Sequence, residues 1–80
     1  MQSIDVNEAL GKKLMIVSLR RFSVAKREEL YIRGLLPGKM LQLVQISPMG
    51  DPLIIRVDQQ KFAMNCDTWA QLDLEEIPTC

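Results

Sequence analysis

Short apolar segments separated by turn residues dominate the chain, and each has a length and composition typical of a β-strand. The expected strands span residues 13–19, 39–46, 53–57, 62–66 and 72–77. The two-residue alternation of the second strand slips once, between Leu43 and Val44, which predicts a bulge or a strong bend. The last strand alternates apolar and polar residues cleanly, so Asp73 and Glu75 are expected on its solvent side.

Helical signals concentrate between the first two strands. Ser23 is a good N-cap, and Gly34 suits the left-handed position after a helix end, which predicts a helix over residues 24–33. Pro37 prevents the helix from continuing. A short helical turn is also expected over residues 6–10, capped by one of two nearby polar residues, Ser3 or Asp5.

The length of 80 residues allows one small domain, which we expect to span residues 1–80. Five short strands cannot form a sandwich at this length, but they can close a small barrel and so remove exposed sheet edges. The sequence therefore predicts a mainly β fold, a small five-stranded barrel with one short helix inserted after the first strand.

The formal net charge is zero, but it hides a polarised chain. Residues 1–50 carry eight basic and four acidic side chains, a net charge of +4, whereas residues 51–80 carry two basic and six acidic ones, a net charge of −4. If the first and last strands are neighbours, part of this separation is neutralised within the fold. A uniformly basic nucleic-acid binder and an acidic tail are both excluded by the balanced total.

The residues that usually carry catalysis or bind metals are scarce. The chain has no histidine, and its two cysteines, Cys66 and Cys80, are isolated. Phosphate-binding glycine motifs and a nucleophile elbow are absent as well. We therefore expect no catalytic residues, no metal site, no cofactor and no Cys66–Cys80 disulfide. The longest apolar run, residues 14–17, is too short to span a bilayer, and no secretory signal is visible, so a cytoplasmic protein is expected.

The most distinctive segment is Leu35-Leu36-Pro37-Gly38. A helix exit followed by a turn explains it structurally. However, two adjacent leucines on a connection are poorly placed for full burial, so the segment is also a candidate docking surface. The basic residues of the first half leave a second interpretation open, a small nucleic-acid-binding module, although aromatic residues for base stacking are not interleaved with them. These basic residues are Lys12, Lys13, Arg20, Arg21, Lys26, Arg27, Arg33 and Lys39.

The order of these features resembles the FeoA family, ferrous iron transport protein A. The similarity is carried by Gly34-Leu35-Leu36-Pro37-Gly38, by Ser47-Pro48-Met49-Gly50-Asp51-Pro52 and by the segments 63–65 and 72–74, and it spans roughly residues 11–77. Three positions depart from the family pattern: Arg33 replaces an apolar residue, Asn65 an arginine, and Trp69 a small residue.

The resemblance implies an SH3-like barrel and a cytoplasmic accessory protein that docks on FeoB, the membrane transporter for ferrous iron, which carries a GTPase domain. It would then lie at the inner face of the cytoplasmic membrane when bound. A role as an iron carrier is disfavoured by the lack of histidine, and self-association stays open. We expect an apolar contact with a basic rim, formed by Tyr31, Leu35, Leu36, Pro37, Met49, Arg27 and Arg33.

Overall fold

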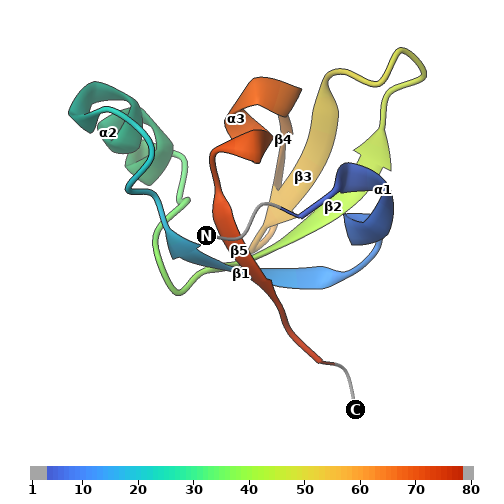
Figure 1. Cartoon of the computed structure of the whole chain (residues 1–80), viewed down its shortest axis with the longest axis horizontal. Coiled ribbons are helices and arrows are strands. Elements are labelled where there is room, and N and C mark those ends of the chain that lie inside the picture. Colours follow the sequence, from blue (N-terminus) through green and yellow to red (C-terminus); the bar gives the residue numbers. More distant parts are fainter. Residues whose placement is uncertain (1–3, 79–80) are drawn as a thin grey trace.

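The computed structural model describes residues 4–78, which form one five-stranded antiparallel sheet with three short helices (Figure 1). The elements follow in the order α1 (Val6–Ala9), β1 (Lys13–Ser18), α2 (Val24–Ile32), β2 (Met40–Ile46), β3 (Leu53–Val57), β4 (Gln60–Met64), α3 (Cys66–Ala70) and β5 (Asp73–Glu76). The mainly β prediction and the helix between the first two strands are confirmed. None of the helices within residues 4–78 is long and apolar enough to cross a bilayer.

The strand order is β4-β3-β2-β1-β5, so the first and last strands are neighbours. The sheet curls into an open barrel, and α3 connects its two edge strands, β4 and β5 (Figure 1). The expected irregularity in β2 is confirmed, because its register against β3 shifts between Leu43 and Gln45.

Alternation along the strands builds the core on the concave side. Leu14 and Ile16 of β1 are buried, and the neighbouring strands contribute alternating leucine, isoleucine and valine residues to the same interior. Trp69 of α3 closes this core, and its indole Nε1 donates a hydrogen bond to the carbonyl of Ile4 at 2.7 Å. The N-terminal segment is thereby held against the sheet.

One helix was not anticipated. The sequence predicts a strand over residues 62–66, but β4 ends at Met64 and α3 begins at Cys66. The reason is Asn65, whose side-chain oxygen accepts a hydrogen bond from the backbone N–H of Thr68 at 2.8 Å and so caps the new helix. Near the N-terminus, Asp5 caps α1. The alternative cap Ser3 lies outside the described residues, and so does Cys80 at the C-terminus.

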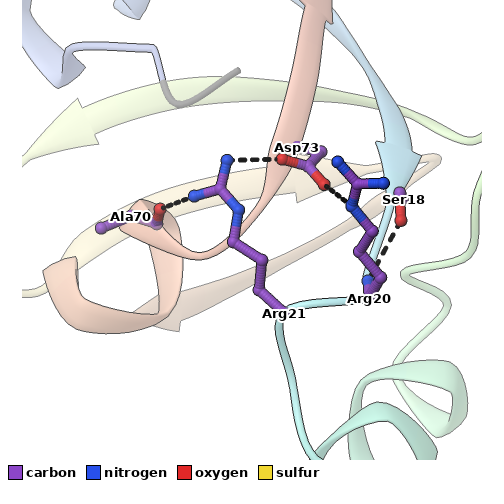
Figure 2. Close-up of polar contacts among 5 residues, drawn as sticks. All are labelled: Ser18, Arg20, Arg21, Ala70 and Asp73. Atoms are coloured by element: carbon purple, nitrogen blue, oxygen red, sulfur yellow. Dashed lines mark hydrogen bonds and ion pairs between the residues drawn. The ribbon is translucent and has the colours of Figure 1, made fainter. Parts of the chain in front are cut away.

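The solvent-facing prediction for Asp73 is wrong. Its exposure is only 4%, because Arg21 Nη2 donates to Asp73 Oδ1 at 2.6 Å and Arg20 Nε lies 3.6 Å from Oδ2 (Figure 2). Arg21 also donates to the carbonyl of Ala70 at 3.0 Å. This clamp joins the β1–α2 connection to the start of β5, and it neutralises part of the charge separation between the two halves of the chain.

Candidate docking surface

The end of α2 determines how the distinctive leucine segment is presented. Gly34, at a φ of +93°, donates its N–H to the carbonyl of Tyr31 at 2.9 Å, and Leu35 donates to the carbonyl of Leu30 at 2.9 Å. These two bonds form a Schellman motif, in which the residue after the glycine packs against the helix residue five positions earlier. Leu30 and Leu35 are accordingly both in the core.

The two adjacent leucines therefore have different roles. Leu35 is fully buried, so the expectation that neither leucine would be fully buried is wrong for this residue. Leu36 keeps 38% of its surface exposed and is followed by the exposed Pro37. The turn is then fixed to β1, because Gly38 donates to the carbonyl of Ile16 at 2.7 Å and Ile16 donates to that of Lys39 at 2.9 Å.

Helix α2 buries only one of its residues, Leu30. Arg27 and the exposed Tyr31 lie four positions apart and so share one flank of the helix. Sequence reasoning missed Val24 and Ile32, which are both exposed hydrophobic residues. Their signal was present in the imperfect apolar pattern of α2, since apolar residues away from the buried position must face solvent. We call the residues Val24, Arg27, Tyr31, Ile32, Arg33, Leu36 and Pro37 the α2 surface.

Arg33 lies against an aromatic side chain of β4. Its guanidinium lies 5.8 Å from the centre of the Phe62 ring, in cation–π geometry. A cleft of about 180 Å³ lies beside this pair, lined by residues of α2, β4 and α3, including Lys26 and Thr68. The arginine that departs from the family pattern thus covers a half-buried aromatic ring.

The structure does not bring Met49 next to the α2 surface. Met49 is 91% exposed on the loop between β2 and β3, which lies at the opposite side of the molecule from α2 in Figure 1. The loop is held by α3, because Cys66 N donates to Asp51 Oδ1 at 2.8 Å and Cys66 Sγ donates to the carbonyl of Gly50 at 3.1 Å.

This arrangement also sets the chemistry of the only cysteine among the described residues. Partial burial raises the pKa of the Cys66 thiol, and the neighbouring Asp51 carboxylate, followed by that of Asp67, raises it further. Such a thiol is a poor nucleophile at neutral pH. Between residues 4 and 78, no three His, Cys, Asp or Glu side chains come together in a group that could hold a metal ion.

Comparison with known proteins places this geometry in a family. The model of the FeoA domain matches residues 8–72. Among solved structures, iron(II) transport protein A from Clostridium thermocellum superimposes with a TM-score of 0.79 at 24% identity over 85% of this chain. An iron uptake regulatory protein, FeoA, superimposes with a TM-score of 0.69 at 27% identity, over 86% of this chain and 88% of that one.

A third similar structure is FeoA from Stenotrophomonas maltophilia, a prokaryotic SH3 domain protein complexed with zinc. It has a TM-score of 0.69 at 20% identity, over 82% of this chain and 81% of that one, and it confirms the SH3-like fold expected from the sequence. This chain spans 41% of the length of the Clostridium thermocellum protein and 64% of FeoA from Chlorobium tepidum.

Proposed function

This chain belongs to the FeoA family, and from this premise we propose that it serves ferrous iron transport as a non-catalytic accessory protein that docks on FeoB. The α2 surface is the proposed contact, and the protein lies at the inner face of the cytoplasmic membrane when bound. The observation that carries the proposal is that α2 exposes Val24, Tyr31 and Ile32 and buries only Leu30.

The composition of the α2 surface supports a protein partner. Tyr31 and Leu36 offer apolar area, and Arg27 and Arg33 supply cations. Tyrosine and arginine are both enriched at protein interfaces. Leu35 contributes indirectly, because its burial fixes the turn that presents Leu36.

The nucleic-acid interpretation has less support. Most basic side chains of the first half are engaged with carboxylates of the same molecule, so they do not form an open cationic cluster. Lys12 pairs with Glu76 at 3.6 Å and Lys39 with Asp58 at 2.9 Å, while Arg20 and Arg21 hold Asp73.

The proposal is tested with Leu36→Asp in a host that depends on ferrous iron uptake. A charge in the centre of an apolar contact should weaken co-purification with FeoB about tenfold or more and lower uptake of ferrous iron. Leu10→Asp is the matched control, because Leu10 is 47% exposed and ends α1, which lies across the molecule from α2 in Figure 1.

Loss of binding and uptake in Leu36→Asp but not in Leu10→Asp supports the α2 surface as the contact. Normal uptake and normal association in a folded Leu36→Asp protein overturn it. Met49→Asp, measured in the same way, decides whether the β2–β3 loop reaches the same partner from its separate position.

A further inference from the structure

Four polar residues form a row across the outer, solvent-facing side of the sheet. Lys13 of β1 is the cross-strand partner of Gln42, Gln42 of Arg56, and Arg56 of Lys61. Directly opposed residues of neighbouring strands point to the same face and lie about 5 Å apart. The row therefore places three cations within about 15 Å on one surface.

This row is not neutralised within residues 4–78. The side chains of Lys13 and Lys61 make no hydrogen bond or ion pair there, and the Arg56 side chain donates only to Gln42 Oε1, at 2.9 Å. Gln42 in turn donates to the carbonyl of Gly11 at 3.1 Å, which orients its oxygen towards Arg56. Like charges directly opposite each other, as at Arg56 and Lys61, destabilise a sheet. An anionic ligand would remove this cost.

Apolar side chains flank the cations on both sides. Met15 and Met40 are paired on one side, and Met40 is 50% exposed. Ile54 and Ala63 are paired on the other side, next to the exposed Val44. We call these residues together with the row the outer sheet face, which comprises Lys13, Met15, Met40, Gln42, Val44, Ile54, Arg56, Lys61 and Ala63.

A hollow of about 380 Å³ lies on the part of this face formed by β1, β2 and β3. Its lining includes Lys13, Met40, Gln42, Arg56 and Asp58. The Asp58 carboxylate is paired with Lys39 Nζ at 2.9 Å. Glu75, the cross-strand neighbour of Met15, marks the acidic limit of the face on the β5 side. Besides the carboxylate paired with Lys39, the hollow is lined by two cations and a thioether, groups that suit a phosphate attached to an apolar chain.

We propose that the outer sheet face binds the surface of a bilayer containing anionic phospholipids. Cations near such a surface attract headgroup phosphates, and apolar side chains beside them enter the boundary of the acyl region. A nucleic acid offers phosphates too, but the exposed Met40, Val44 and Ala63 would gain nothing from a hydrated backbone, and the face carries no aromatic residue for stacking.

The test is sedimentation of the purified chain with vesicles of phosphatidylcholine alone or mixed with phosphatidylglycerol. Binding is expected only to the mixed vesicles and should fall with rising salt. Because each cation near an anionic surface contributes about a factor of five, Arg56→Gln combined with Lys61→Gln should bind about 30-fold more weakly. Lys26→Gln combined with Arg27→Gln removes the same charge from α2 and should leave vesicle binding nearly unchanged.

A further variant, Met40→Gln, tests the apolar part and should weaken binding even at high salt, where the contribution of the cations is screened. Equal binding to both vesicle types would overturn the proposal, and so would an equal loss of vesicle binding in the two double variants. It would also be overturned if a short oligonucleotide displaced the chain from vesicles at a lower concentration than soluble phosphatidylglycerol does. The assay contains no transporter, so its failure leaves the docking of α2 untouched.

Discussion

The α2 surface and the outer sheet face are held in place in different ways. The outer sheet face is carried by four neighbouring strands, and its cations lie on directly paired positions of the backbone hydrogen-bond ladder. The α2 surface is carried by one helix that buries only Leu30. Its position is set by two anchors, the clamp on Asp73 before the helix and the Schellman turn at Leu35 after it.

Because they are held differently, the two surfaces should respond differently to substitutions outside them. Loss of an anchor should move or loosen α2 while the outer sheet face keeps its geometry. Amide exchange localised to α2 is the measurement that separates the two effects, because segments with few buried contacts open first.

The largest effect is expected for Leu35→Ala. The side chain is fully buried against the core, so truncation should lower the free energy of unfolding by about 3 kcal/mol, measured by urea denaturation. Leu36→Ala, one position later, should cost less than about 1 kcal/mol because Leu36 is partly exposed. An equal loss of unfolding free energy in the two variants would contradict the assignment of Leu35 to the core and of Leu36 to the surface.

A smaller loss is expected for Asp73→Asn. The change leaves the Arg21 guanidinium without its carboxylate and should cost about 2 kcal/mol, less than for a fully buried pair since Arg21 is partly exposed. Amide exchange in α2 should rise while that of β2 and β3 stays low. Arg20→Gln is the control, and it should change stability by about 0.5 kcal/mol or less because Arg20 is largely exposed and lies farther from the carboxylate. Unchanged exchange in α2 would show that the clamp does not hold the helix.

The smallest effect concerns the reactivity of Cys66, which begins α3 and is hydrogen-bonded to the β2–β3 loop. Since burial and the Asp51 carboxylate raise the pKa of its thiol, the thiolate fraction is low at neutral pH and increases only above the ordinary thiol pKa. Alkylation by iodoacetamide, followed in a Cys80→Ser background, should be slow near pH 7 and accelerate at alkaline pH. Asp51→Asn should make it faster, whereas Asp73→Asn should not. Acceleration by Asp73→Asn would show that the clamp also supports the β2–β3 loop.

Much of the fold followed from patterns along the chain. The strand over residues 53–57, the α2 helix and the irregularity in β2 were all predicted. Each has a local signal in the sequence: an apolar run for the strand, capping residues for the helix, and an interrupted apolar alternation for the irregularity. The helix α3 was missed, although Asn65 is a good N-cap, because the apolar residues around Cys66 also suit a strand. Local propensity alone does not decide between these alternatives.

The candidate surfaces were predictable only in part. Tyr31 and Leu36 were placed correctly on an exposed segment, but the burial of Leu35 depends on the left-handed Gly34, which turns that side chain inward. The burial of Asp73 depends on arginines about 50 residues earlier in the chain. The row of cations on the sheet depends on the register of four strands, which no single strand reveals.

The clamp between Arg21 and Asp73 joins residues separated by 52 positions. During synthesis, the helix α2 therefore leaves the ribosome well before the carboxylate of Asp73 that anchors it. Strand β1 likewise leaves the ribosome well before β5, with which it pairs in the finished sheet. A nascent chain that ends before Asp73 can form the β2–β3–β4 part of the sheet but lacks the clamp, one of the two anchors of α2. Recognition by a partner at the α2 surface would thus distinguish finished molecules from incomplete ones.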